Sequence, residues 1–113
     1  MSDNDLVILS KIERLILDLS PAIERIPKYQ RFRYAKRLED GFWDLVYLVI
    51  QAAASNQRSR VYRVDEQIRF LHTLIRHGAE RKFLSPKRAG FAGRELSEIG
   101  SMIGAWKKRL QGR

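Results

Sequence analysis

Histidine and carboxylate side chains are the residues of this sequence that could do acid–base or metal chemistry, and their spacing argues against both. The two histidines, His72 and His77, are five positions apart, which puts them on different faces of a helix, where they would not share a metal ion. The closely spaced carboxylates lie among basic residues, which is typical of ion pairs on helix surfaces: Glu39, Asp40, Glu95 and Glu98. Cysteine is absent, which excludes disulfides and thiolate chemistry. We therefore expect no catalytic residue, no metal site and no cofactor.

A small helical ribonuclease of the HEPN type is the catalytic alternative. Such enzymes have an arginine followed by a histidine after four to six residues. Arg69 and His77 have seven residues between them, one too many for that motif, and Arg76 and His77 have none. There is also no Gly-rich phosphate loop and no supporting Ser/His/Asp set. His77 is better explained as part of a basic surface, so the sequence favours a protein that is not an enzyme.

Positive charge is the dominant property of the chain. The 113 residues include 22 Lys and Arg against 13 Asp and Glu, a formal net charge of +9. Such an excess favours polyanionic partners: nucleic acid, an anionic membrane surface or an acidic protein. No stretch approaches the roughly 20 apolar residues of a membrane span. The acidic start "MSDNDLVILSKIE" is also unlike a signal peptide, so we expect a cytoplasmic protein with no membrane partner.

Apolar residues recur at helical spacing through nearly the whole sequence, and no segment alternates as a strand would. They form four stripes, over residues 8–26, 35–52, 64–78 and 92–110. Four amphipathic helices with short connections predict an all-α fold: an up-down antiparallel four-helix bundle, as one domain over residues 1–113.

Capping residues and prolines predict where two of these helices begin and end. Asp3 and Asn4 are the expected caps of the first helix, which Pro21 should interrupt and Pro27 should end. Ser85, directly before a proline, is the expected cap of the last helix.

Two of the helices carry features that a lone bundle does not need. Helix 35–52 has a second apolar stripe beside its core stripe: Trp43, Val46, Tyr47 and Ile50. Helix 86–110 has small residues along one side: Gly93, Ser97, Gly100 and Gly104. Each glycine inside a helix costs about 1 kcal/mol relative to alanine, and close approach of another helix is a physical reason for it. We interpret both features as a subunit interface. The alternative is that the glycines are tolerated surface residues and the aromatic residues broaden the core.

An up-down bundle concentrates the positive charge at the end where the first and third helices finish. The candidate residues for binding nucleic acid or an enzyme partner there are Lys28, Arg31, Arg33, Lys36, Arg37, Arg76, Arg81, Lys82, Lys87 and Arg88. Such clusters neutralise phosphates, and Tyr29 and Tyr34 could stack on unpaired bases, whereas we expect Phe32 to be buried. A solvated helix start without a ligand is the alternative. The opposite end is less densely basic and includes Lys107, Lys108, Arg109 and Arg113.

The segments "RFRYAKRLEDGFWDLVYLVIQAA" and "KFLSPKRAGFAGRELSEIGSMIGAWKK" together resemble the accessory variability determinant (Avd) proteins of diversity-generating retroelements. The wider family also includes four-helix bundles encoded in intervening sequences of bacterial large-subunit ribosomal RNA genes. The resemblance extends over nearly the whole chain, and its most specific parts are "FLSP" and "EIGSMIGAW".

This resemblance implies a homopentameric ring of four-helix bundles with a positive surface. Such a ring would bind the reverse transcriptase of the element together with RNA or DNA, and would support error-prone, adenine-directed cDNA synthesis and retrohoming. It implies no catalytic residues. Arg31, Arg33, Lys36 and Arg37 would belong to the surface that meets the enzyme or the RNA, and the glycine-lined side of helix 86–110 would lie near a subunit contact. The ribosomal relatives leave a second function open, RNA binding without a reverse transcriptase.

Overall fold

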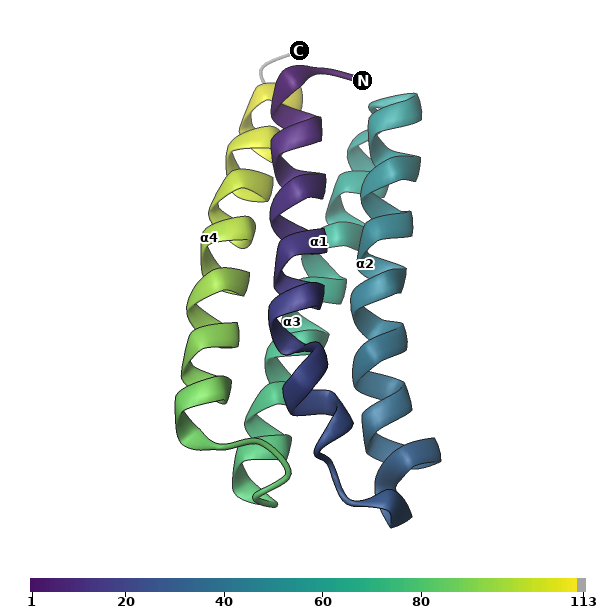
Figure 1. The fold of residues 1–113 in the computed structure, drawn as a ribbon. Coiled ribbons are helices and arrows are strands. Elements are labelled where there is room, and N and C mark those ends of the chain that lie inside the picture. The colour runs from purple at the N-terminus through teal and green to yellow at the C-terminus, as the bar shows by residue number, and fades with distance from the viewer. Residues whose placement is uncertain (112–113) are drawn as a thin grey trace.

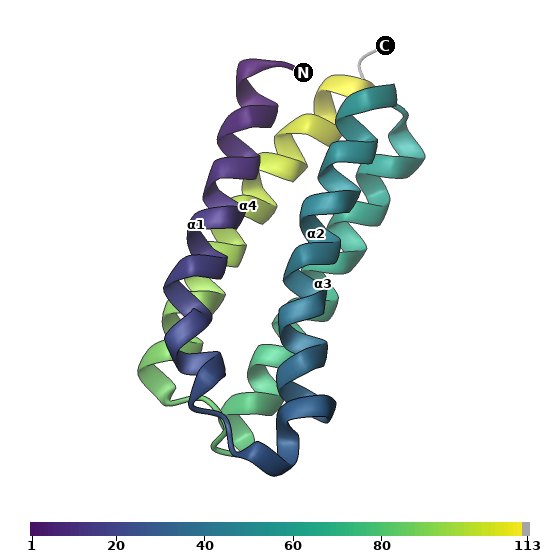
Figure 2. The same ribbon diagram turned by 45° about the vertical axis from the view of Figure 1, so that its right-hand side comes forward.

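A computed structural model describes residues 1–111 of the chain and contains, over that range, four α-helices and no strand (Figure 1). The helices are α1 (Asp3–Glu24), α2 (Lys36–Ser55), α3 (Arg58–Glu80) and α4 (Pro86–Gln111). Helix α1 packs against α2 and α4, and α3 packs against the same two helices. Consecutive helices run in opposite directions in both views (Figures 1 and 2), in a body of 48 × 21 × 21 Å. The expected all-α fold is confirmed, and its arrangement is that of an up-down four-helix bundle.

The core consists of the four apolar stripes. Their members at helical spacing are buried throughout, from Ile8 and Ile12 in α1 to Ile103 and Leu110 in α4. Phe42 in α2 is among the largest side chains that are fully buried. Truncation of such a residue to alanine removes its transfer free energy and leaves a cavity, at about 2–5 kcal/mol. Burial of these stripes is therefore what holds the four helices together.

The beginning and the proline of α1 differ from the sequence-based expectation. Ser2, rather than Asp3 or Asn4, is the N-cap: its hydroxyl accepts a hydrogen bond from the Asp5 N–H, and the Asp5 carboxylate accepts one from the Ser2 N–H. The helix also continues through Pro21 as far as Glu24. Proline lacks the N–H that would bond to the carbonyl one turn earlier. Pro21 and Leu17, whose carbonyl lacks this bond, are both exposed, so water can satisfy the carbonyl and the helix persists.

The two expected boundaries at Pro27 and Ser85 are confirmed. No α-helix includes Pro27, which lies between α1 and a 3-10 turn over Lys28–Gln30. The Ser85 hydroxyl accepts a hydrogen bond from the Arg88 N–H at 3.1 Å, which caps the first turn of α4.

Asn56 terminates α2 and joins it to α4. Its φ of 53° lies in the left-handed region, where asparagine is tolerated better than most residues. Its backbone N–H donates to the Ala52 carbonyl at 2.7 Å. Its side-chain Oδ1 accepts a hydrogen bond from Trp106 Nε1 at 3.0 Å. One residue thus ends a helix and satisfies the indole of a buried tryptophan in another.

Substitution of Asn56 separates these two contributions. We expect Asn56→Gly to lower the free energy of unfolding by about 1 kcal/mol, because the indole loses its partner. Asn56→Ala should cost about 1 kcal/mol more, because it also forces a side chain into the left-handed conformation. Urea denaturation followed by circular dichroism measures both values. Equal losses in the two variants would show that the backbone conformation contributes nothing.

Candidate nucleic-acid interface

The connection between α1 and α2 and the connection between α3 and α4 lie at the same end of the bundle, at the bottom of Figures 1 and 2. This end carries the ten basic residues predicted from the sequence, and we call it the basic end. Arg88 is half-buried and the other nine are exposed: Lys28, Arg31, Arg33, Lys36, Arg37, Arg76, Arg81, Lys82 and Lys87. The up-down topology, which the sequence predicts, is therefore sufficient to locate these residues at one end of the bundle. At the opposite end, Arg113 lies outside the described residues.

The entry into α2 contains two irregular turns, the 3-10 turn over Lys28–Gln30 and a π turn over Arg31–Ala35. Tyr34 anchors them to α3. Its side chain is buried, and its hydroxyl donates a hydrogen bond to the Leu74 carbonyl at 2.6 Å. The ring also packs against Phe83, with the ring centroids 5.2 Å apart. Burial raises the pKa of Tyr34 to about 12, so the phenol stays neutral and keeps donating near neutral pH.

Gly78 supplies the space for this anchor. A Cβ at position 78 would overlap the hydroxyl of Tyr34 and would lie 2.8 Å from Cζ of the same ring. Any side chain there would push Tyr34 away from α3 and separate the start of α2 from the end of α3. The glycine was recognised from the sequence as part of the core stripe of α3, but its contact with Tyr34 was not.

The predicted roles of Phe32 and Tyr34 were both wrong, and in opposite directions. Phe32 is 81% exposed, and Tyr34 is only 6% exposed, so Tyr34 presents no ring to a base. Tyr34 precedes Leu38 of the core stripe by four residues, one helical turn, and this spacing together with a glycine in α3 is the signal that could have identified it. Tyr29 is 68% exposed and remains available for stacking.

Three of the predicted arginines are brought together in one groove, between the start of α2 and the end of α3. Arg33, Arg37 and Arg81 line it with His77, and Arg81 is held 5.1 Å above the ring of Phe83. None of the three arginines forms an ion pair with a residue of the described range. Their charge is therefore available for an anion from outside the bundle.

The remaining basic residues are placed differently. Lys36 pairs with Asp40 at 2.7 Å, as expected for carboxylates one turn away, and this hydrogen bond raises the pKa of Lys36. Arg31 lies on the far side of Phe32, in a groove that also contains Glu24 and Glu39. The two basic residues at the start of α4, Lys87 and Arg88, do not line the arginine groove. Arg33, Arg37 and Arg81 are thus the members of the basic end that share one groove free of carboxylates.

The apolar stripe of α2 is exposed, as the interface interpretation requires. Trp43, Tyr47 and Ile50 are 49%, 61% and 41% exposed, whereas Val46 is half-buried and packs against the core. Contiguous aromatic and aliphatic surface of this kind is typical of a protein contact.

The glycines of α4 at positions 93, 100 and 104 have room for a Cβ atom. A Cβ added at Gly93 or Gly104 would meet no atom within 4 Å, and one at Gly100 would lie 3.8 Å from Ile68 Cγ2 of α3. Packing within the subunit therefore does not require these glycines. Lys107 follows on the same side and pairs with Asp65 of α3 at 3.4 Å, so this side of α4 is turned toward α3.

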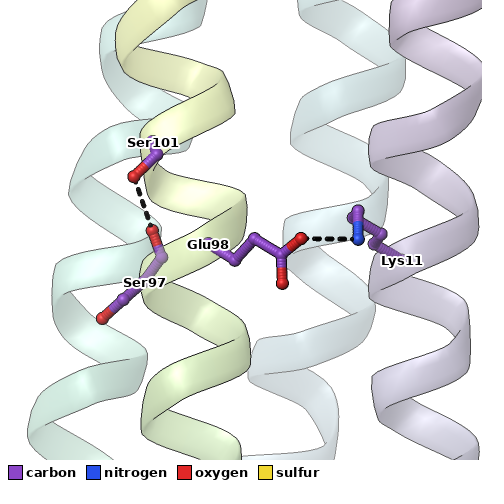
Figure 3. A network of polar contacts seen from close by, with 4 residues as sticks. All are labelled: Lys11, Ser97, Glu98 and Ser101. Atoms are coloured by element: carbon purple, nitrogen blue, oxygen red, sulfur yellow. Dashed lines mark hydrogen bonds and ion pairs between the residues drawn. The ribbon is translucent and has the colours of Figure 1, made fainter.

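The other side of α4 is joined to α1. Glu98 accepts a hydrogen bond from Lys11 Nζ at 2.8 Å, so it pairs with α1 rather than within its own helix (Figure 3). That bond holds the pKa of Glu98 below its ordinary value and the pKa of Lys11 above it. On the small-residue side, the Ser101 hydroxyl donates to the Ser97 carbonyl of its own helix at 3.1 Å (Figure 3). Between Gly93 and Gly104, this face of α4 consists only of glycine and serine residues and therefore carries no bulky side chain.

These features define the protein as a basic four-helix bundle with a groove lined by arginines at one end and exposed apolar and small-residue faces along its sides. The sequence model of the bAvd-like family matches residues 6–110, which is most of the chain, and the protein belongs to this family. The resemblance to Avd proteins is thereby confirmed. No curated protein sequence matches the chain.

Avd-like helical bundles are not a known family of enzymes. In the part of the chain that the structure describes, no helix combines the length and the apolar character that a membrane crossing needs.

Lys82 gives a test that separates stability from binding at this end. Its φ of 62° lies in the left-handed region, immediately after α3, where the Phe83 N–H donates to the Gly78 carbonyl at 2.8 Å. Glycine is the residue that this type of helix end prefers. We expect Lys82→Gly to raise the free energy of unfolding by about 1 kcal/mol and to weaken RNA binding at low salt, because one cation is lost.

Urea denaturation and RNA binding at two salt concentrations measure the two effects. Lys82→Asn is the matched control, since it also removes the charge but tolerates the backbone conformation less well than glycine. Unchanged or lower stability of Lys82→Gly would contradict the strain argument.

Proposed function

We propose that the protein is a non-catalytic accessory subunit of a diversity-generating retroelement, acting in the cytoplasm. It serves as a basic, oligomeric scaffold that binds the reverse transcriptase of the element together with RNA or DNA. In this way it supports mutagenic cDNA synthesis and retrohoming. The observation that carries the proposal is the cluster of unpaired arginines at one end of a bundle of the bAvd-like family.

The charge distribution supports a nucleic-acid partner. Arg33, Arg37 and Arg81 present guanidinium groups that can bind phosphate oxygens in a bidentate manner. Each neutralised phosphate releases counterions, which gives affinity that falls steeply with salt. One groove of this size supplies few contacts, so useful affinity requires several copies acting together.

The two side faces support assembly into a ring. The aromatic stripe lies on α2 and the glycine side lies on α4, and these two helices are diagonal in the bundle because each packs against α1 and α3. The two surfaces therefore belong to different parts of one subunit. Contact between two different surfaces of identical subunits is heterologous, and such contacts close into rings when the rotation permits. The aromatic side chains of one subunit would lie over the glycine backbone of the next. Avd-like relatives imply five subunits, and we propose the homopentamer on that basis.

Arginine-to-serine substitution tests the nucleic-acid part. The triple variant Arg33→Ser, Arg37→Ser, Arg81→Ser should lose RNA affinity, and the slope of log K against log salt should shrink by about one for each phosphate contact removed. The matched control removes three exposed basic residues from the opposite end: Arg58→Ser, Arg63→Ser, Lys108→Ser. Both variants change the net charge equally. Equal losses in the two would show that binding follows net charge and not the groove.

A pull-down from the native host at low and then moderate salt tests the retroelement role. We expect a reverse transcriptase and one discrete RNA with the unaltered protein, and neither with the triple groove variant. Ribosomal RNA without a reverse transcriptase would instead indicate the function suggested by the ribosomal intervening-sequence relatives.

Enlarging a glycine tests the ring. Gly104→Leu should leave the subunit folded, because its side chain enters open space, and should slightly stabilise α4, since glycine costs about 1 kcal/mol in a helix. It should, however, break the subunit contact and lower the mass measured by light scattering. Ala105→Leu, at the exposed neighbouring position, is the control and should keep the assembly. A monomeric mass for the unaltered protein at micromolar concentration would contradict the proposal.

A further inference from the structure

Phe32 stands at the border of three grooves of the basic end, and these differ in charge. The groove toward α1 contains three carboxylates, Glu24, Glu39 and Asp40, beside Arg31 and Lys36. The groove along α2 contains Asp40 and Asp44 together with Lys36 and with the opposite sides of Arg33 and Arg37. The third is the arginine groove, of ≈ 510 Å³, which no acidic side chain lines. The arginine groove is therefore the one of the three in which a polyanion would meet positive charge without a carboxylate beside it.

The exposure of Phe32 is imposed by the fold. Its ring is 81% exposed, the largest exposed fraction among the large apolar side chains of residues 1–111. It belongs to the π turn that Tyr34 fixes to α3 through the Leu74 carbonyl. Phe32 and Tyr34 are two residues apart on this turn, so the ring of Tyr34 is directed inward and the ring of Phe32 outward. π turns occur frequently at functional sites, and an apolar ring kept in water is a feature that folding alone does not favour.

The chemistry around the ring selects an unpaired nucleotide. An exposed aromatic face beside guanidinium groups matches a base next to its phosphates, because bases stack on aromatic side chains and phosphates bind arginine. Arg33 is adjacent to Phe32 in the chain, and Arg37 follows one turn later on α2. A groove of this volume is also in the size range that holds a small ligand. A base within a duplex is already stacked on both faces and cannot cover the ring.

We propose that the arginine groove binds an unpaired nucleotide of single-stranded RNA or DNA, with its base on the ring of Phe32 and its phosphates on Arg33, Arg37 and Arg81. This inference rests on the proposed function, since it requires nucleic-acid binding, and adds that the preferred form is single-stranded. Tyr29 offers a second exposed ring three residues earlier, so consecutive bases can use two aromatic residues.

Three substitutions at Phe32 separate stacking from charge and from plain hydrophobicity. Fluorescence anisotropy with the full-length protein measures binding to labelled oligouridine, oligothymidine and an RNA duplex of equal length. Phe32→Ala should weaken single-strand binding about 5- to 150-fold, the equivalent of roughly 1–3 kcal/mol for one stacked base. Phe32→Leu should weaken it similarly, because leucine has no aromatic face, whereas Phe32→Trp should retain it.

The accompanying readouts exclude other causes. The salt slope should stay unchanged in all three variants, because no charge is removed, and duplex binding should change less than twofold. Phe70→Ala is the matched control: this residue is 42% exposed on α3 and lines the groove along α2, but it does not line the arginine groove. It should bind single strands as the unaltered protein does. A loss on RNA, on DNA or on both upholds the inference and identifies the strand.

The failure of this inference is distinguishable from failure of the proposed function. If the unaltered protein binds no oligonucleotide at low salt, both are overturned. If it binds single strands and Phe32→Ala binds them equally well, only the stacking site is overturned. Equal weakening of single strands and duplex by Phe32→Ala would likewise overturn the single-strand preference.

Discussion

The contact between the hydroxyl of Tyr34 and the backbone of α3 determines how the basic end is built. The hydroxyl donates to the Leu74 carbonyl at 2.6 Å and occupies the space that a side chain at position 78 would need. Because Gly78 has no side chain, the start of α2 can approach the end of α3 closely. The π turn that carries Tyr34 inward carries Phe32 outward, and Arg33 and Arg37 come to lie beside the last turns of α3. An interaction buried in the core thus sets the geometry of the exposed surface.

The same glycine organises the end of α3. Its carbonyl accepts hydrogen bonds from the N–H groups of both Phe83 and Leu84, which closes the helix with Lys82 in the left-handed conformation. Phe83 then packs on Tyr34, and Arg81 lies over the ring of Phe83. Natural proteins keep backbone strain where function requires it. A lysine at this turn, where glycine is favoured, is consistent with retention of charge at the expense of stability.

Periodicity predicted most of the fold and only part of the site. The core stripes, the order of the helices and the basic end follow from spacing of three and four residues and from short connections, because burial of an apolar stripe leaves few other arrangements. Tyr34 and Phe32 were assigned wrongly because their turn is irregular, and the partner that decides their orientation lies 44 residues away from Tyr34, at Gly78. The grouping of Arg33 and Arg37 with Arg81 depends on that same long-range contact. Spacing within one helix carries no information on it.

The position of the groove relative to the side faces has a consequence for an assembly. The arginine groove lies at the end of the rod, whereas the aromatic stripe of α2 and the glycine side of α4 lie along its length. Subunits that associate through these side faces leave their ends uncovered. Rotational symmetry in the proposed ring then gives every subunit's groove the same orientation relative to the ring axis. One strand that follows the ring can meet several grooves in turn, so that weak and salt-sensitive contacts add up to a stable complex.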